Sequence, residues 1–132
     1  MPGRPVIPPG AAVAGPYSPA VQAGRFLFIS GQLPVLASGE LSTGPIEEQT
    51  RLCLERISTI VQAAGGSVRD LVKVTIYLTD MEQFAAVNEA YASFFTDALP
   101  ARACIEVRRL PNDAHLEIEA VAHLDPQGQP LG

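Results

Sequence analysis

Apolar residues recur at spacings of three and four along one stretch of the chain, the repeat of a helix with one buried face. They are Ile46, Cys53, Leu54, Ile57, Ile60, Val61 and Ala64. Pro45 suits the first helical turn, where its missing N–H costs no hydrogen bond, and Glu47 and Glu48 lie near the positive end of the helix dipole. The glycine pair that follows tolerates the left-handed backbone that ends many helices. The pattern therefore predicts a helix over residues 45–64.

Residues 71–80 follow the other repeat, an alternation with period two that is typical of a strand with two different faces. One face carries Val72, Val74, Ile76 and Leu78, and the other carries Lys73, Thr75, Tyr77 and Thr79. A second helix is predicted over residues 81–95, because Thr79 or Asp80 provides an N-cap and an apolar stripe returns at helical spacing. The stripe consists of Phe84, Val87, Tyr91 and either Phe94 or Phe95.

Two hairpins are predicted from strand-like runs joined by turn residues. Residues 25–35 are rich in aromatic and β-branched residues, and the turn after them has Gly39 at its tip, which predicts a hairpin over residues 25–42. Near the end of the chain, the runs 101–110 and 115–124 are separated by a Pro-Asn-Asp turn. We expect these two runs to pair with each other as the second hairpin.

The ends of the chain carry little periodic signal. Residues 1–20 are rich in Pro, Gly and Ala, and we expect an irregular N-terminal arm over residues 1–15. The final stretch, "DPQGQPLG" over residues 125–132, predicts a flexible tail. Since there is no linker and no internal repeat, residues 1–132 are expected to form a single domain.

The element order is therefore β-β-α-β-α-β-β, which predicts an α+β sandwich. Long helices between alternating strands favour one mixed β-sheet with both helices on one face. The other face would carry Thr75 and Tyr77, which are neither fully polar nor fully apolar. Such a face often packs against another subunit.

Composition favours self-association and disfavours nucleic acid. Hydrophobic residues make up 47% of the 132 residues and charged residues 17%, so a small domain has little interior in which to bury its apolar surface. The net charge is −5, and the densest basic cluster, Arg102, Arg108 and Arg109, is diluted by Glu106. An acidic protein binds polyanions poorly, so we expect no nucleic-acid partner.

The two cysteines, Cys53 and Cys104, form no CxxC motif, and His115 and His123 lack the spacing of a structural zinc site. We expect two reduced thiols and no metal.

No segment approaches the ~20 apolar residues that span a bilayer, and prolines interrupt the start of the chain where a signal peptide would need a continuous apolar run. The expected location is therefore cytoplasmic, with no membrane partner.

Arg102 is the first candidate for chemistry. It shares a strand face with Cys104 and Glu106, and a guanidinium is a planar fork of donors that fits a carboxylate. The partner is either internal, in a salt bridge, or a ligand. Its place at the start of a strand just after Pro100, where site mouths lie, favours the ligand.

Glu117 and Glu119 alternate with apolar residues in the last strand. If the hairpin register allows, one of them lies on the face of Arg102 and orients or activates a water. The alternative is a solvated strand face.

Five further residues are candidates for a binding pocket. Asn88 lies on or beside the apolar stripe of the second helix, where asparagine is unfavourable unless its amide is bonded. Ser30 and Gly31 end a strand, either as a β-bulge or where a ligand approaches the backbone. Tyr17 either covers a pocket or anchors the arm, and Cys104, with no base near it in sequence, is a pocket wall and no nucleophile.

The chain resembles the reactive intermediate deaminase family, also called the RidA or YjgF family, over residues 14–123. The resemblance is carried by "GPYSPAV", "FLFISGQLPV", "IVQAAGGSVRDLVKVTIYLTDMEQFAAVNEAYASFF", "PARACIEVRRLP" and "LEIEAVA". It implies a chorismate-mutase-like fold, a homotrimer with sites in clefts between subunits, and no metal or organic cofactor. It also implies hydrolysis of enamines and imines, such as 2-aminoacrylate, 2-iminopropanoate and 2-iminobutanoate, to 2-keto acids and ammonia.

By this resemblance, Arg102 grips the substrate carboxylate and Glu117 positions the attacking water. The matching pocket positions are Tyr17, Ser30, Gly31, Asn88 and Cys104. The loop before Arg102 is shorter than in some relatives and the tail is longer, which leaves the preferred substrate open. Two other functions stay open as well: a non-catalytic module that binds small carboxylates, and an endoribonuclease or translation inhibitor, which the acidic composition disfavours.

Overall fold

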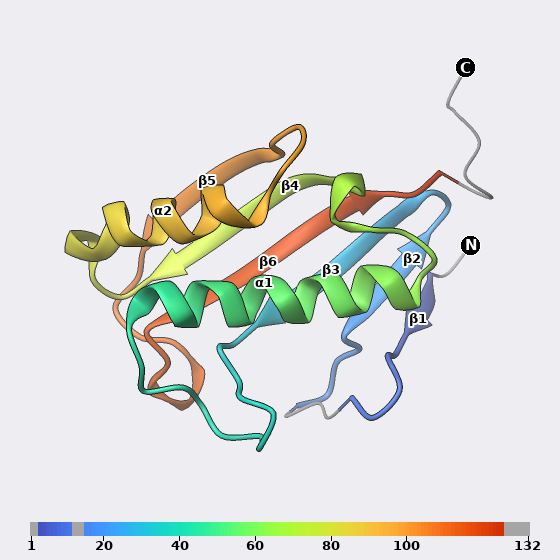
Figure 1. The fold of residues 1–132 in the computed structure, drawn as a ribbon. Coiled ribbons are helices and arrows are strands. Elements are labelled where there is room, and N and C mark those ends of the chain that lie inside the picture. Colours follow the sequence, from blue (N-terminus) through green and yellow to red (C-terminus); the bar gives the residue numbers. More distant parts are fainter. Residues whose placement is uncertain (1–2, 12–14, 126–132) are drawn as a thin grey trace.

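The computed structural model describes residues 3–11 and 15–125 as one six-stranded sheet with two helices on one face (Figure 1). The helices are α1 (Ile46–Ala63) and α2 (Phe84–Phe94). The strands are β1 (Arg4–Val6), β2 (Ala20–Ala23), β3 (Phe26–Gln32), β4 (Leu71–Leu78), β5 (Ala101–Glu106) and β6 (Leu116–His123). Three short 3₁₀ turns, η1 (Val68–Asp70), η2 (Met81–Gln83) and η3 (Pro111–Asp113), connect them.

The sheet is mixed, with the spatial order β1-β2-β3-β6-β4-β5. β4 and β5 run parallel, as joining them through α2 requires, and every other neighbouring pair is antiparallel. The predicted α+β class, with one mixed sheet and both helices on one face, is confirmed.

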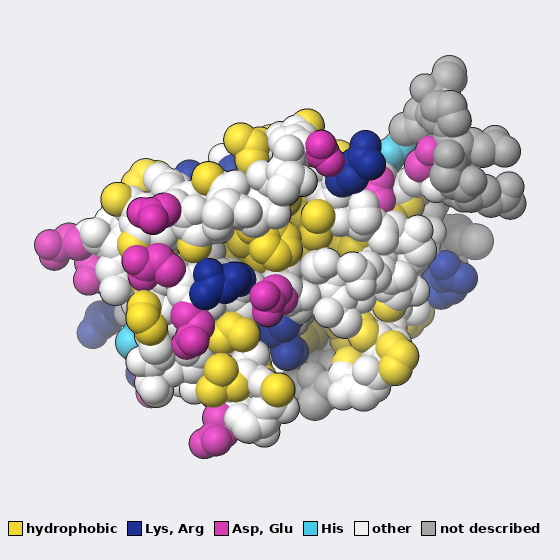
Figure 2. Space-filling view, viewed as in Figure 1, with side chains coloured by type: hydrophobic (Ala, Val, Ile, Leu, Met, Phe, Trp, Pro, Cys, Tyr) yellow, Lys and Arg dark blue, Asp and Glu magenta, His cyan; other side chains and the backbone are white. Residues whose placement is uncertain are grey.

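The core lies between α1 and the sheet. The apolar stripe predicted from the sequence is buried on α1, where Cys53, Leu54, Ile57 and Val61 have no exposed surface. The helix begins after Pro45 and ends at Ala63, so its predicted range is confirmed to within one residue at each end. Of the sheet residues beneath the helices, Leu27, Val74, Ile76, Leu78, Leu116 and Ile118 are fully buried. Figure 2 shows this helix-covered side, where a group of apolar side chains is visible with acidic and basic side chains near it.

The predicted hairpin over residues 25–42 is wrong. β3 pairs with β2, which precedes it, and residues 33–42 contribute only an isolated bridge between Val35 and Leu41. The physical reason lies in the two connections. Gly24 takes a left-handed conformation with φ of 60° and makes a tight turn from β2 into β3, whereas Pro34 lacks the N–H that a continuing strand would donate.

The N-terminal segment also forms part of the sheet. β1 lies within the stretch that we expected to be irregular, and it pairs antiparallel with β2. Short alternation over three residues is too weak to predict a strand. The expected tail lies outside the described residues, apart from Asp125.

The predicted pairing of the last two strands is wrong as well. β6 lies between β3 and β4, and β4 separates it from β5. The central position buries four alternate apolar residues of β6 under the helices: Leu116, Ile118, Ala120 and Ala122. In η3, Asn112 and Asp113 both take positive φ, so the connection is a longer turn and not a two-residue hairpin.

The sheet face opposite the helices is open in the single chain, and no helix of the described residues covers it. Phe26, Phe28 and Ile105 lie on this face with about half of their surface exposed, at 45%, 50% and 46%. Exposed aromatic rings on a flat sheet face are typical of a surface that another subunit covers. Neither described helix combines the length and the apolar composition needed to cross a membrane.

Candidate functional site

Arg102 lies on the helix-covered side, in a small cleft at the sheet edge. The parallel register aligns it with Val74 of β4, so its side chain turns toward α2. Its Cζ atom is 4.9 Å from the ring centroid of Tyr91 and 5.7 Å from that of Phe84, close enough for cation–π attraction. The cleft has a volume of about 280 Å³ and is lined by Asn88, Tyr91, Ala92, Leu99, Pro100 and Arg102.

Two oxygens near Arg102 are buried without a hydrogen-bond partner among the described residues: Asn88 Oδ1 and Tyr91 Oη. Arg102 also has no ion pair there, since the two ion pairs of the described residues join Arg69 to Asp97 and Arg109 to Asp113. Burial raises the pKa of Tyr91 despite the opposing effect of Arg102, so the phenol keeps its proton. Buried polar groups are normally satisfied, so this cleft has the properties of a site for a polar ligand.

Glu117 lies on the open face of the sheet. It pairs with Tyr77 of β4, and its carboxylate lies against the backbone of Gly31. A Cβ atom at Gly31 would occupy the position of that carboxylate, so a larger residue there would displace the Glu117 side chain. Burial raises the pKa of Glu117, and the charge of Glu119 raises it further. Tyr77 Oη donates a 2.9 Å hydrogen bond to Glu119 Oε1, which fixes the second carboxylate.

Arg102 and Glu117 lie on opposite faces of the sheet in one chain. Val74 is aligned with both Arg102 and Ala120, so these three share the helix-covered face, and Glu117 is at odd separation from Ala120 along β6. The expectation that the two candidate catalytic residues meet across a hairpin is therefore wrong. The two residues do not meet because β6 pairs with β3 and β4, and β4 lies between β6 and β5.

The other candidates divide between these two places. Asn88 and Cys104 lie with Arg102, because Cys104 is aligned with buried Ile76. Burial raises the pKa of Cys104 more than Arg102 lowers it, so the thiol is neutral and suits a pocket wall. Among the described residues, no three His, Cys, Asp or Glu side chains gather as a metal site.

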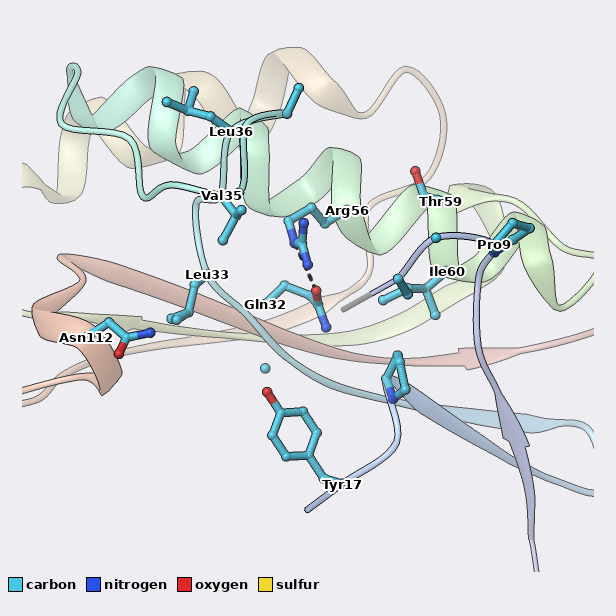
Figure 3. Close-up of a pocket in the computed structure, with 16 residues that line it drawn as sticks. Pro9, Tyr17, Gln32, Leu33, Val35, Leu36, Arg56, Thr59, Ile60 and Asn112 are labelled. Carbon is cyan, nitrogen blue, oxygen red and sulfur yellow. Dashed lines mark hydrogen bonds between the residues drawn. The ribbon is translucent and has the colours of Figure 1, made fainter. Parts of the chain in front are cut away.

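Ser30, Gly31 and Tyr17 lie on the other side, near Glu117. The strand register slips between Ile29 and Gln32, so Ser30 and Gly31 form the predicted irregularity in β3. Ser30 holds the N-terminal segment: its Oγ donates to the Ser18 carbonyl at 2.7 Å, and its N–H donates to the Pro19 carbonyl at 2.9 Å. Tyr17 is 51% exposed and lines a cavity together with Gly31 (Figure 3).

Tyr91 is the member of the Arg102 cleft that sequence reasoning missed. Its position on the apolar stripe predicted a core residue, and only 5% of its surface is exposed. One feature of the sequence could have indicated this role: Tyr91 follows Asn88 by three residues, so both side chains lie on one face of the helix. The contact with Arg102 crosses from helix to strand, so no local pattern contains it.

Comparison with known proteins shows the family to which the chain belongs. The sequence model of a family described as endoribonuclease L-PSP matches residues 9–124. A RutC family protein from Pyrococcus horikoshii is 53% identical over 110 residues, which cover 83% of this chain and 87% of that protein. The 2-iminobutanoate/2-iminopropanoate deaminase of Salmonella typhimurium is 43% identical over 114 residues, covering 84% and 89%.

Solved structures show the same relation. The YjgF gene product of Escherichia coli superposes with a TM-score of 0.87 at 40% identity, covering 91% of this chain and 98% of that one. Escherichia coli TdcF with bound serine gives a TM-score of 0.82 at 42% identity, covering 95% and 99%. The chain therefore belongs to the YjgF/RidA family, whose members include proteins named reactive intermediate deaminases.

Proposed function

We propose that this protein is an enamine and imine deaminase that converts 2-aminoacrylate, 2-iminopropanoate and 2-iminobutanoate to 2-keto acids and ammonia. The observation that carries the proposal is the Arg102 cleft, a cationic hollow of about 280 Å³ with two unpartnered oxygens and no internal counterion in the described chain. Such a cleft suits one small carboxylate. The names of two relatives, which are about 43% and 44% identical, support the same chemistry.

The proposed reaction needs neither a covalent nucleophile nor a cofactor. The substrate carboxylate pairs with Arg102, which holds C2 of the imine at a fixed place. The reacting form is the imine protonated on nitrogen, and 2-aminoacrylate reaches it by gaining a proton from water at C3. Glu117 accepts a proton from a water as the water oxygen bonds to C2, and the electron pair of the C=N double bond moves to nitrogen, which gives a neutral carbinolamine. The resulting carbinolamine then collapses as its hydroxyl loses a proton, the nitrogen gains one, and ammonia leaves. A carboxylate with a raised pKa is well suited to accept and return that proton.

The proposed site is shared between copies of the chain. Since Arg102 and Glu117 lie on opposite faces of one sheet, a complete site requires Arg102 of one copy and Glu117 of the next. The open face supplies exposed apolar surface at Phe26, Phe28 and Ile105 for that association. We propose a homotrimer, in which three such interfaces close around an axis and Tyr17, Ser30 and Gly31 of one copy face Asn88 and Cys104 of its neighbour.

The test is imine hydrolysis in competition with semicarbazide. An L-amino-acid oxidase generates 2-iminobutanoate in place, and semicarbazone formation is followed by absorbance. Wild-type protein should suppress the semicarbazone, whereas Arg102→Ala should lower kcat/KM by at least about 100-fold because the carboxylate loses its anchor. The matched control is Arg108→Ala, an exposed arginine six residues on, which should keep full activity. Hydrolysis by Arg102→Ala at the wild-type rate would contradict the proposal.

A mixing experiment tests whether the site is shared. Glu117→Gln should also lose about 100-fold in kcat/KM, because the amide does not accept a proton from water. When Arg102→Ala and Glu117→Gln chains are co-expressed and assembled at random, about one interface in four combines an intact Arg102 with an intact Glu117. Recovery of about a quarter of wild-type activity is therefore expected. No recovery would place both residues in one chain's site or separate them from catalysis.

A further inference from the structure

A second cavity lies at the other side of the molecule from the Arg102 cleft. It has a volume of about 510 Å³ and opens between the N-terminal segment, the chain after β3, α1 and η3 (Figure 3). Its walls are mainly apolar, with Pro9, Leu33, Val35, Leu36 and Ile60 among them. A size of a few hundred Å³ and mainly apolar walls with a few fixed polar groups are the usual properties of a small-molecule site.

The one cationic side chain that lines this cavity, Arg56 of α1, is held in a fixed orientation. Its Nε–H donates to Gln32 Oε1 at 3.1 Å, and Gln32 Nε2 donates to the Ser30 carbonyl at 3.0 Å. Gln32 is only 6% exposed, so it is a buried support with both ends of its amide bonded. Because Nε is occupied, the two terminal amino groups of the guanidinium are left to face the cavity, where Figure 3 shows the side chain pointing inward.

Among the described residues, Arg56 has no acidic partner that would neutralise it. Both ion pairs of the described residues involve other arginines, Arg69 and Arg109, and no Asp or Glu lines the cavity. The residues outside the description, 1–2, 12–14 and 126–132, contain no Asp or Glu in the sequence. A preorganised guanidinium beside apolar walls therefore lacks the anion that it is shaped to bind.

We propose that this cavity binds a small organic acid, with its carboxylate on the terminal amino groups of Arg56 and its hydrocarbon body against Leu33, Val35 and Ile60. A carboxylate fits better than a phosphate, because the cavity has one cationic group and large apolar walls. Within one chain this site is separate from the Arg102 cleft: it lies beside β3, and β6 and β4 stand between it and β5. In the proposed trimer its Tyr17 and Gly31 end borders the shared catalytic site, whereas Arg56 lies at the α1 end. Binding of an organic acid at Arg56 does not require imine hydrolysis, although the cavity shares Tyr17 and Gly31 with the proposed catalytic site.

The experiment uses 3-phenylpropanoate as the probe, since it has a carboxylate and an apolar body but no 2-keto group. Binding to the full-length protein is measured by calorimetry, and the uncharged 3-phenylpropanamide is the ligand control. We expect saturable binding with one molecule per chain. Arg56→Gln should weaken it by about 10-fold or more, as the loss of a charge-assisted hydrogen bond implies. Arg102→Gln, the same change in the other site, should alter the dissociation constant by less than about 2-fold.

Mapping on the wild-type protein keeps the test independent of how the variants fold. In amide NMR spectra, the probe should shift the signals of Leu33, Thr59 and Ile60 more strongly than those of Asn88 and Arg102. The proposal is overturned by any of three results: no saturable binding up to millimolar probe, equal binding of the amide, or shifts confined to Asn88 and Arg102. Retained catalysis by Arg56→Gln would leave the proposed deaminase activity standing whatever the probe does.

Discussion

The two faces of the sheet differ in what they bury and in what they leave exposed. Under the helices, Val74, Ile76 and Ile118 have no exposed surface, and the charged Arg102 lies at the edge beside an aromatic ring. On the open face, phenylalanines are half exposed, and two neighbouring glutamates occupy alternate positions of β6. The covered face therefore supplies the stability of the single chain, whereas the open face holds groups that become useful when a second copy covers them.

The largest effect should come from a cavity on the covered face. Ile76→Ala removes a fully buried side chain and should lower the free energy of unfolding by about 2–5 kcal/mol. Its neighbour Thr75 is half-buried on the open face, and Thr75→Ala should cost less than about 1 kcal/mol. Urea unfolding followed by circular dichroism measures both. Equal costs would mean that the two faces contribute alike to the stability of the chain.

The next effect concerns assembly. Phe28→Asp puts a charge on the open face beside the exposed ring of Phe26 and should weaken association by about 100-fold or more. Sedimentation velocity should then show single chains whose circular dichroism spectrum is unchanged. Ala85→Asp, which adds the same charge on the exposed side of α2, is the control and should leave assembly intact. Unaltered assembly of Phe28→Asp would exclude the open face as the interface.

A smaller effect, with opposite signs for stability and binding, is expected at Tyr91. Its hydroxyl is buried without a partner in the described chain, so Tyr91→Phe should raise the free energy of unfolding by about 1 kcal/mol. If the hydroxyl serves a ligand, the same change raises KM for 2-iminobutanoate by about 5-fold and leaves the pH profile of kcat in place. Thermal unfolding and steady-state kinetics give the two numbers. A loss of stability would show that the hydroxyl is bonded within the protein.

The smallest effect concerns the pH dependence of stability at Glu117. Its pKa is raised above the ordinary value near 4.5, so the folded chain binds the proton more tightly than the unfolded chain. The free energy of unfolding therefore falls as the pH rises from about 4.5 through the raised pKa of Glu117. Above that pKa, the cost of ionising the half-buried carboxylate stays constant. Glu117→Gln removes this cost and should be more stable at pH 8, by less than about 1 kcal/mol, because solvent screens a half-buried group. Below pH 4 the two proteins should unfold alike, and a constant difference across this range would exclude titration as the cause.

Local periodicity predicted both helices and the strands β3 to β6, but it missed the short strands β1 and β2. The stripe from Ile46 to Val61 gave α1 to within one residue at each end, and the alternation gave the two faces of β4 correctly from Val74 to Leu78. Val72 was wrongly placed on the buried face: it is 43% exposed, because the register shifts between Leu71 and Lys73. The alternation in β5 also predicted correctly that Arg102 and Cys104 share a face. These statements depend only on the periods of helix and strand.

The order of strands was beyond the same reasoning. Alternation tells which residues of one strand share a face, but it does not tell which strands are neighbours. Pairing β5 with β6 put Glu117 within reach of Arg102, whereas the structure places β4 between them. The bond between Arg56 and Gln32 was missed for a related reason, because it joins residues 24 apart in sequence. Contacts of this kind are chosen by packing of the whole chain.

The central position of β6 has a consequence for how the protein is made. β6 is the last strand of the described chain to leave the ribosome, yet it joins β3 on one side to β4 on the other. Until it is synthesised, β1-β2-β3 and β4-β5 are two separate pieces of sheet with unpaired inner edges. Such edges are sites of mispairing between nascent chains. The growing polypeptide thus depends on its final strand to close the fold, and truncation before Leu116 should yield an aggregating product and not a smaller domain.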